Sequence, residues 1–466
     1  MRFVRQRRDH RVAPAMALIA SWLMVSCAGY TPKRLDGEAV AATLASPDRS
    51  VLVKQASAMS HPALPKVQLD FAQPLSLDEI SVIAVLANPD LRALRAQQRV
   101  ADAQIFSAGL LADPQLSLGV DRLMAPSGQG LANAYAGSLT LDLLGALMTR
   151  NVEIEGARSA ATQVRLDIAW QEWNTAGQAR LLALRLPYQL KAQRLARRAA
   201  DDANAQLDRT LVAAANRDLN GDEVESRRIA AADAETRALA AERDAQTTQL
   251  ELNRVLGLQP NEPLTLTAVA PLDHWQHPDE SALFENARQQ RLDLQALAAG
   301  YESQQAAVHR AVLGQYPRVS IVLNRARDTS RVHTFGPAIT LDIPLWNRNR
   351  GAIASTEADR DRLQQEYAAR LHQTRADIAA LVEAQDRDER ARAALAEQLE
   401  SIAPIAEALQ HAADRGDVTQ PIAESAKAAL VDKQLALLAL EQACAEQRLA
   451  LALSVGHSLT DADSKS

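Results

Sequence analysis

Few residues of this chain have side chains arranged for catalysis or for metal binding. The segment His274-Trp-Gln-His277, which follows Asp273, carries donor atoms that could hold a metal ion. The two histidines lie in a proline-rich stretch, where such side chains are more often surface polar groups, so we expect no metal. The sequence has no glycine-rich phosphate loop, no HExxH and no Gly-x-Ser-x-Gly. It therefore predicts neither an enzyme nor a bound cofactor.

Cys27 is the residue for which the sequence most clearly predicts a chemical modification, namely acylation. An apolar run from residue 12 to 25, too short for a helix of about 20 residues that spans a bilayer, leads through Ser26 to Cys27. Basic residues precede the run: Arg2, Arg5, Arg7, Arg8 and Arg11. The pattern resembles a bacterial lipobox, whose cysteine receives fatty acids such as palmitate and becomes the mature N-terminus, and Ala28 after it implies outer-membrane sorting. The alternative is an ordinary secretory signal that contains a cysteine by chance.

The second cysteine, Cys444, lies in a helical stretch rich in alanine and leucine. Such a position favours a small buried hydrophobic side chain over a reactive nucleophile. If Cys27 is lipidated, Cys444 is the remaining thiol, and the mature chain cannot form an intramolecular disulfide.

The composition limits the class of protein that has to position these residues. A net charge of −6, with 47% hydrophobic and 23% charged residues, suits a folded protein and argues against a nucleic-acid partner. Aromatic residues make up only 3%, while Ala, Leu, Gln, Glu and Arg dominate residues 147–256 and 349–455. This composition is typical of long, closely packed helices.

The chain is an internal duplication. The segment Asn88-Pro-Asp-Leu-Arg-Ala-Leu94 returns as Arg291-Leu-Asp-Leu-Gln-Ala-Leu297, a shift of 293 − 90 = 203 positions. Beyond the first hairpin the shift is 341 − 141 = 200, which pairs Leu141 with Leu341. Each copy is therefore expected to be one supersecondary unit, in the order helix, strand, strand, long helix, that cannot bury its apolar face alone.

Each copy contains a hairpin whose side chains alternate between apolar and polar. The outward residues of the expected strands are Leu116, Leu118, Val120, Leu139, Leu141 and Leu143 in the first copy, and Val319, Ile321, Leu323, Ile339, Leu341 and Ile343 in the second. The opposite faces are mostly Ser, Thr, Asn and Asp, although Val322 interrupts one of them. Four strands of about eight to ten residues have the length and pattern of transmembrane strands.

A half-buried soluble sheet shows the same alternation and is the alternative. The flanking helical stretches are much longer than the strands, so they are poorly shaped to cover two short hairpins. If the apolar face meets lipid, the sheet must close, because an open edge in hydrocarbon leaves backbone groups unpaired. Four strands cannot enclose water, so we expect three copies to supply twelve.

Helices are expected on both sides of each hairpin. One begins at Leu77 and runs to Gly109 with a break near Pro89, and long helices span about 147–212 and 349–414. Two prolines, Pro187 and Pro404, should kink these long helices or divide them. Turns at 216–221 and 415–419 reverse the chain into shorter helices that end at the glycines Gly257 and Gly456. Residues 28–74 suggest an extended tether with one short helix.

This order resembles that of the TolC-like outer-membrane efflux proteins. The resemblance covers about residues 75–456 and rests on Asn88-Pro-Asp-Leu91 and on Leu341-Asp-Ile-Pro-Leu-Trp-Asn-Arg-Asn-Arg-Gly351. The latter is similar to the family's junction between the last strand and the long helix; the junction residues are Pro344, Leu345, Trp346, Asn347, Arg348 and Gly351. Its counterpart in the first copy, Leu144-Gly145-Ala146, is degenerate.

The resemblance implies a mixed α/β membrane protein. It would be a homotrimer with a 12-stranded outer-membrane β-barrel that continues into a long periplasmic α-helical barrel. It would conduct small molecules or ions passively as the exit duct of a tripartite efflux or type I secretion system. Its partners would be a periplasmic adaptor protein, an inner-membrane transporter and outer-membrane lipid, and it would be lipid-anchored and extend into the periplasm.

The same reading divides the chain into six segments. These are a signal peptide with lipobox (1–27), an N-terminal tether (28–75), a first efflux repeat (76–257), a linker in the equatorial region (258–278), a second efflux repeat (279–456) and a C-terminal tail (457–466).

A periplasmic gate is expected where the long helices reverse direction. Threefold symmetry would bring three copies of each ionisable side chain near these turns toward the axis; the candidates are Asp222, Glu223, Arg227, Asp417 and Glu424. In the family, acidic rings and salt bridges narrow this entrance, but here Ile422 and Ser425 stand at the matching positions. The alternative is that these charges form a solvated helical face.

Two other classes of protein remain open from the sequence. A periplasmic coiled-coil adaptor is also long-helical and often lipidated, although it usually carries one helical hairpin rather than two. A structural coiled-coil lipoprotein without a pore would have no strands.

Overall fold

The computed structural model describes residues 30–42, 44–122, 133–216, 221–268, 272 and 274–456. The chain divides into two units, each of which is described by itself. The first unit ends at Ser46 and contains the short helix α2 (Gly37–Ala42). The second unit begins at Pro47 and contains all the other elements described below.

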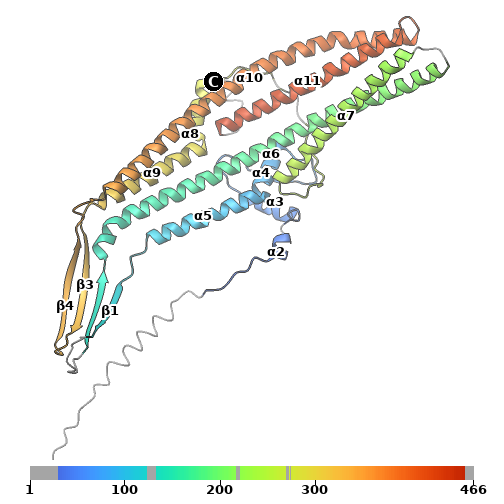
Figure 1. Ribbon diagram of the computed structural model, residues 1–466. Coiled ribbons are helices and arrows are strands. Elements are labelled where there is room, and N and C mark those ends of the chain that lie inside the picture. The colour runs from blue at the N-terminus through green and yellow to red at the C-terminus, as the bar shows by residue number, and fades with distance from the viewer. Residues whose placement is uncertain are drawn as a thin grey trace, which may run out of the picture. The chain divides into compact units, whose positions relative to one another are not determined.

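The second unit repeats one order of elements (Figure 1). Helices α3 (Arg49–Ala58), α4 (Leu77–Ala87) and α5 (Pro89–Ala108) lead into strands β1 (Gln115–Asp121) and β2 (Ala134–Leu141), followed by α6 (Leu143–Ala215) and α7 (Gly221–Val255). Helices α8 (Glu280–Gln290) and α9 (Leu292–Leu313) then lead into β3 (Arg318–Arg327) and β4 (His333–Asp342), followed by α10 (Arg350–Asp414) and α11 (Gln420–Val455). In Figure 1 the strands lie at one end of the long helices, and the turns between α6 and α7 and between α10 and α11 lie at the other. The duplicated helix, hairpin and long-helix order is as predicted.

The predicted break near Pro89 is confirmed, and its cause is a helix cap. The side chain of Asn88 accepts hydrogen bonds from the backbone N–H groups of Asp90 (2.9 Å) and Leu91 (3.1 Å). Pro89 is the first helical residue after this cap, where its missing N–H is not needed. Arg291, the counterpart of Asn88, also separates two helices, α8 and α9, but its side chain makes no capping hydrogen bond.

The packed core shows the duplication at the level of side chains. Ile80 and Leu252 lie in a cluster formed by α3, α4, α6 and α7, and neither is exposed to solvent (0%). Their counterparts Leu283 and Leu451 lie in a cluster formed by α8, α10 and α11. Each repeat thus buries the apolar stripe of its short first helix between its long helix and its returning helix.

Both returning helices end at a glycine, as predicted. Gly257 has a φ angle of 62° and Gly456 one of 91°, the left-handed conformation in which side chains are strained. A Cβ atom on Gly257 would lie 2.5 Å from the carbonyl oxygen of Ala87. The side chain of Asn88 donates to the carbonyl of Val255 (2.9 Å) and that of Arg291 to the carbonyl of Ser454 (2.8 Å), so each helix end is fixed to the helix break of its own repeat.

The two long helices are continuous through their prolines. Helix α6 has 73 residues and contains Pro187; α10 has 65 and contains Pro404. The alternative that these prolines divide the helices is therefore wrong. Helix α6 also begins earlier than predicted, because Leu143, expected as an outward strand residue, is its first residue; Ile343 likewise lies beyond the end of β4. Among the described residues, no helix combines the length and hydrophobicity needed to cross a membrane.

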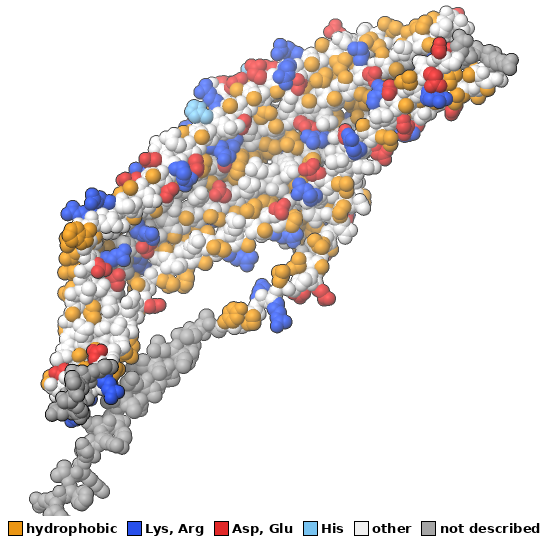
Figure 2. Space-filling model, viewed as in Figure 1, with side chains coloured by type: hydrophobic (Ala, Val, Ile, Leu, Met, Phe, Trp, Pro, Cys, Tyr) orange, Lys and Arg blue, Asp and Glu red, His pale blue; other side chains and the backbone are white. Residues whose placement is uncertain are grey.

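The four strands form one antiparallel sheet in the order β1-β2-β3-β4. The register aligns apolar residues in rows across the sheet, for example Leu116, Leu139, Leu323 and Pro337. This face is uncovered: Leu118 is 78% exposed and Ile339 70%, and hydrophobic side chains are visible on the strand region in Figure 2. No described segment of the chain buries it, which agrees with the prediction that the helices cannot cover the hairpins.

The segment predicted as a tether contributes to the core, and we call residues 49–75 the N-terminal strap. Leu52 and Ala56 of α3, together with Leu69 and Leu75, are buried in the first core cluster. The backbone of Leu75 also exchanges hydrogen bonds with Thr265 and Thr267 of the linker, both of 2.9 Å. With α2 in the first unit, the region has two short helices rather than one. The irregular spacing of its apolar residues hides this packing from a periodicity analysis.

Candidate functional site

The candidate gate residues lie at the ends of three helices. Helix α10 ends at Asp414, and the chain turns through Gly416, whose φ angle is 80°, into α11. The backbone N–H of Asp417 donates to the carbonyl of Ala412 (2.8 Å), which closes the helix end. On the other side, Asp222 and Glu223 occupy the first turn of α7, where the helix dipole favours acidic side chains.

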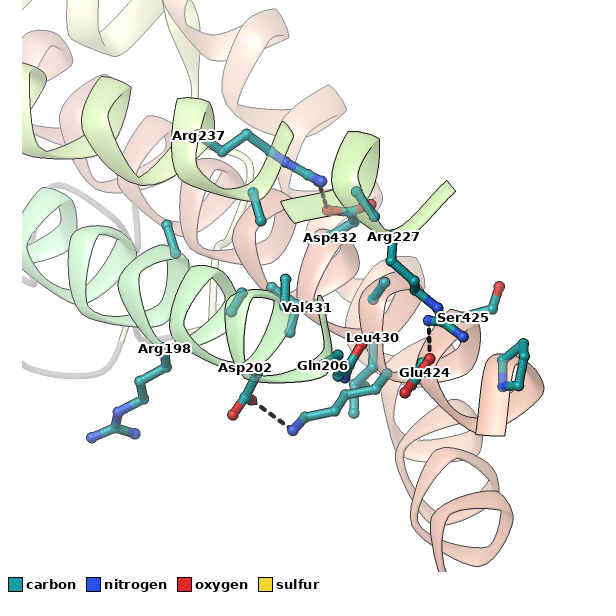
Figure 3. A pocket seen from close by; sticks show the side chains of 18 of the residues that line it. Arg198, Asp202, Gln206, Arg227, Arg237, Glu424, Ser425, Leu430, Val431 and Asp432 are labelled. Atoms are coloured by element: carbon teal, nitrogen blue, oxygen red, sulfur yellow. Dashed lines mark hydrogen bonds and ion pairs between the residues drawn. The ribbon is translucent and has the colours of Figure 1, made fainter. Parts of the chain in front are cut away.

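The centre of this region is an ion pair between α7 and α11. The guanidinium of Arg227 contacts the Glu424 carboxylate (Figure 3), and it lies 3.9 Å from the Glu223 carboxylate. The side chains of Arg227 and Glu424 are only 15% and 14% exposed. A charge pair this sheltered is weakly screened, and removing one partner leaves the other uncompensated.

Three further ion pairs join the first repeat to α11, and we call the four pairs together the ion-pair ladder. Asp202 of α6 pairs with Lys427 (2.6 Å). Arg237 of α7 pairs with Asp432 (2.5 Å), as Figure 3 shows. The guanidinium of Arg185 donates twice to the Glu446 carboxylate, each time at 2.8 Å, and this hydrogen bonding raises the pKa of Arg185. The ladder therefore connects the two repeats along α11.

A partly open cavity of about 880 Å³ lies between α6, α7 and α11 beside the ladder. Its walls combine alanines with the charged side chains of three ladder pairs, all except Arg185 with Glu446, and Asp222 and Glu223 also line it. Charged groups of the two repeats thus meet beside a water-accessible space.

The structure brings together four of the five candidate gate residues. Asp222, Glu223, Arg227 and Glu424 lie around the cavity. Asp417 instead forms a local pair with Arg415 (2.9 Å) in the turn after α10. The sequence analysis missed the other ladder residues, which are Arg185, Asp202, Arg237, Lys427, Asp432 and Glu446. The sequence does contain a sign of this pairing, because residues of opposite charge stand at similar distances from the two turns. Arg237 lies 10 residues beyond Arg227, and Asp432 lies 8 residues beyond Glu424.

The predicted junction residues connect β4 to α10. Arg348 and Asn349 have positive φ angles of 45° and 55°, which turn the chain from strand into helix. The side chain of Asn349 donates to the carbonyl of Ala311 (2.7 Å) and so fixes the turn to α9. Trp346 is 90% exposed and Leu345 64%. Gly351 lies in the first turn of the helix.

The histidine segment forms a hydrogen-bonded cluster. His277 contacts the Asp386 carboxylate through Nδ1 (2.8 Å), and the indole of Trp275 donates to the same carboxylate (2.5 Å). Burial opposes ionisation of Asp386, but these two hydrogen bonds hold its pKa below the usual value. In the part of the chain that the structure describes, no group of three potential metal-binding side chains is close enough to hold an ion.

Of the two cysteines, only Cys444 lies among the described residues. Cys444 is fully buried, as predicted. Cys27 lies outside the described residues.

Comparisons with known proteins address the class to which this architecture belongs. Residues 283–457 match the family model described as outer membrane efflux protein. A comparison with curated protein sequences gives no match. Among solved structures, the fold is similar to that of CusC, from a study of transmembrane channel formation (TM-score 0.67, 15% identity, 89% of this chain and 99% of that chain). It is also similar to the Campylobacter jejuni CmeC outer membrane channel (0.69, 15%, 84% and 88%) and to the Vibrio cholerae outer membrane protein VceC (0.64, 18%, 82% and 97%).

The fold is similar to that of solved outer-membrane channels, and residues 283–457 match the family model of outer membrane efflux proteins. Both findings agree with the resemblance of the sequence to the TolC-like outer-membrane efflux proteins.

Proposed function

We propose that three copies of this chain form a passive exit duct for small molecules or ions across the outer membrane. The observation that carries the proposal is the sheet β1-β2-β3-β4, which has an uncovered apolar face and leaves β1 and β4 as edges. In hydrocarbon an edge cannot keep its backbone groups unpaired. Pairing β1 of one copy with β4 of the next satisfies both edges, and three copies give a closed barrel of twelve strands.

The opposite face of the sheet suits a water-filled lumen. One row across it consists of Ser117, Ser138, Asn324 and Gly336, all small or polar. Below the strands, the helices of three copies would form the periplasmic α-helical barrel. The exposed Trp346 and Leu345 in the junction between β4 and α10 would then lie at the membrane surface, where aromatic side chains are favoured.

The remaining assignments complete the proposal. Residues 76–257 and 279–456 act as the two repeats, joined by the linker 258–278, and Cys27 carries the lipid anchor. The duct receives its substrate from an inner-membrane transporter through a periplasmic adaptor, in either a tripartite pump or a type I secretion system. The structural lipoprotein without strands is excluded by β1 to β4.

The decisive experiment is planar-bilayer conductance of the detergent-purified protein together with its mass in solution. We expect discrete channels from a trimer. The comparison variant lacks both hairpins, residues 115–141 and 318–342, and should not conduct. A soluble monomer without conductance would contradict the duct and revive the adaptor as the alternative.

A second experiment separates the duct from an adaptor by extraction. Cys27→Ser removes the proposed anchor. A barrel protein still needs detergent for extraction after this change, whereas an adaptor would become soluble.

We further propose that the ion-pair ladder holds the periplasmic end closed. The sheltered pair Arg227 and Glu424 should contribute most, because exposed pairs such as Lys427 with Asp202 are each worth only about 0–1 kcal/mol. Glu424→Gln should therefore increase the conductance of the resting channel, and the double exchange R227E/E424R should restore the closed level.

Asp417→Asn is the matched control for the gate. It also neutralises one acid at this end of the molecule, but its partner Arg415 lies in the same turn. Equal conductance of wild type and Glu424→Gln would show that the charges form a solvated face and not a gate.

A further inference from the structure

Two arginines of β3 lie on the apolar face of the sheet. Leu323, Arg325 and Arg327 stand at alternate positions of β3, so all three side chains point to the same side of the strand. Arg325 is aligned with Phe335, and Arg327 is aligned with Tyr135 and His333. We call these five residues the rim patch: Tyr135, Arg325, Arg327, His333 and Phe335.

The rim patch ends the apolar band at the hairpin turns. The next row toward the helices is apolar throughout, with Leu116, Leu139, Leu323 and Pro337, and the turn begins directly after Arg327. Charged side chains on a lipid-facing surface are unfavourable at mid-bilayer depth and tolerated near the headgroups. The rows of the rim patch therefore fit the headgroup level on the side away from the helices, and Phe335 and Tyr135 fit the aromatic girdle found there.

The rim patch has more positive than negative charge. Among the described residues, neither Arg325 nor Arg327 has an ion pair, and Nε of Arg327 is shielded from solvent without a hydrogen-bond partner. The nearest acid in the β3–β4 turn, Asp328, accepts a hydrogen bond from the backbone of Val332 (2.8 Å). Residues 123–133 of the other turn contain no acidic residue. Basic side chains are also visible near the turns of the strands in Figure 2.

The duplication repeats this arrangement only in part. Tyr135 and Phe335 are equivalent under the shift of 335 − 135 = 200 positions, and Arg122 and Arg325 under the shift of 325 − 122 = 203. In the second copy Arg325 and Phe335 share a row, whereas in the first copy Tyr135 is aligned with Val120 and Arg122 lies beyond the end of β1.

We propose that the rim patch binds the phosphate groups of an anionic glycolipid in the outer leaflet, an inference that rests on the proposed orientation of the duct. A guanidinium donates two parallel hydrogen bonds to a phosphate, and two guanidiniums on alternate residues of one strand can serve two phosphates or share one. The aromatic residues on the same rows contact the acyl chains just below. A trimer carries three such patches, one for each copy of β3.

The test measures binding of diphosphorylated lipid A to the purified full-length protein in detergent by native mass spectrometry. Dephosphorylated lipid A and phosphatidylglycerol are the comparison lipids. We expect saturation at three or more lipid A molecules per trimer, and binding weakened about tenfold or more in the double variant R325Q/R327Q. The double variant R325K/R327K, which keeps the charge but loses the paired donors, should lie between them.

Arg318→Gln is the matched control, because Arg318 lies on the same strand but on the polar face, in the row of Asp342. It should bind lipid A as wild type does. Trimer mass and channel conductance of every variant establish that it is folded. Equal binding by wild type and R325Q/R327Q would contradict the lipid site at the rim patch and leave the duct intact. Equal binding of phosphorylated and dephosphorylated lipid A would do the same. Absence of trimers and channels in the wild type would instead contradict the duct itself.

Discussion

At the scale of single residues, Cys444 shows how strongly the helical packing controls chemistry. Burial, reinforced by the nearby Glu389 carboxylate, raises the pKa of its thiol from 9.0 to about 11. Since the thiolate is the reactive form, a rise of two units lowers its fraction at pH 8 about a hundredfold. We expect Cys444 to react with a maleimide at least a hundredfold more slowly in the folded protein than in guanidinium chloride.

The control for this labelling places a thiol on the exposed face of α10. In the variant Cys444→Ala/Ser401→Cys the single introduced thiol is at an exposed position. It should react at similar rates in the folded and unfolded states. Rapid labelling of Cys444 in the native protein would mean that the α10 and α11 helices open far more than the structure indicates.

A second prediction at this scale concerns the glycine at the end of α7. Gly257→Ala forces a side chain into a left-handed conformation and against the Ala87 carbonyl, so both strain and overlap oppose it. We expect the thermal unfolding midpoint of the detergent-solubilised protein to fall by several degrees. Gly351→Ala, at a helical position with open space around it, should leave the midpoint unchanged or raise it slightly. Equal midpoints for the two variants would contradict the docking of α7 on the helix break.

At the scale of elements, the N-terminal strap contains a histidine that should make it sensitive to acid. The side chain of His61 is 4% exposed; its Nδ1 accepts a hydrogen bond from the backbone of Ala63 (3.1 Å), and its Nε2 faces the Ala169 carbonyl (3.3 Å). Burial lowers its pKa below 6.5, an effect that Glu172 and Ala169 oppose and Arg95 supports. The neutral ring therefore satisfies both nitrogens, and protonation would place an N–H against an N–H.

Because the pKa of His61 is lowered in the folded protein, acid should destabilise the N-terminal strap. Above about pH 6.5 His61 is neutral in the folded and the released strap, but below it the released strap gains the proton more readily. Stability of the strap is thus present at neutral pH and lost as the pH falls. We expect limited proteolysis between residues 59 and 75 to accelerate from pH 7 to pH 5.5.

Two substitutions test whether this sensitivity belongs to His61. His61→Gln keeps a donor for Ala169 but does not titrate, so the cleavage rate should become nearly independent of pH after correction for the protease itself. His277→Gln changes an exposed histidine elsewhere and should retain the wild-type pH dependence. If it is His277→Gln that removes the dependence, the strap is not the acid-sensitive element.

The elements differ in how far the sequence predicts them. Alternation and helical composition are local properties, so they predict four strands, two long helices and their returning partners with errors of a few residues, such as Leu143. The pairs of the ion-pair ladder are not local: Arg237 and Asp432 lie 195 positions apart, and their pairing depends on the packing of α7 beside α11. For the same reason the sequence could not separate Asp417, which pairs within its turn, from Glu424, which spans two repeats.

At the scale of the whole molecule, the single chain has two features that the proposed assembly in a membrane would satisfy. Its sheet has an uncovered apolar face, and its edge strands β1 and β4 have unpaired backbone groups on their outer sides. A soluble monomer would expose both, and each favours aggregation. The helices show the same need, since apolar side chains such as Phe106 of α5 and Ile229 of α7 are 70% and 62% exposed.

Neighbouring residues of β1 provide a test of which face meets lipid. Leu116 belongs to the middle apolar row, and Ser117 to the polar row on the other side. Leu116→Arg should oppose folding into the membrane by about 2–4 kcal/mol per copy, because it places a charge at mid-bilayer depth. We expect it to abolish most of the trimer seen by native mass spectrometry. Ser117→Arg introduces the same side chain at the neighbouring position and should leave the trimer intact. It should lower the conductance and shift the selectivity toward anions, because three arginine side chains then line the lumen. If Ser117→Arg prevented assembly and Leu116→Arg were tolerated, the apolar face would be the inner one and the orientation of every strand in the proposed barrel would be reversed.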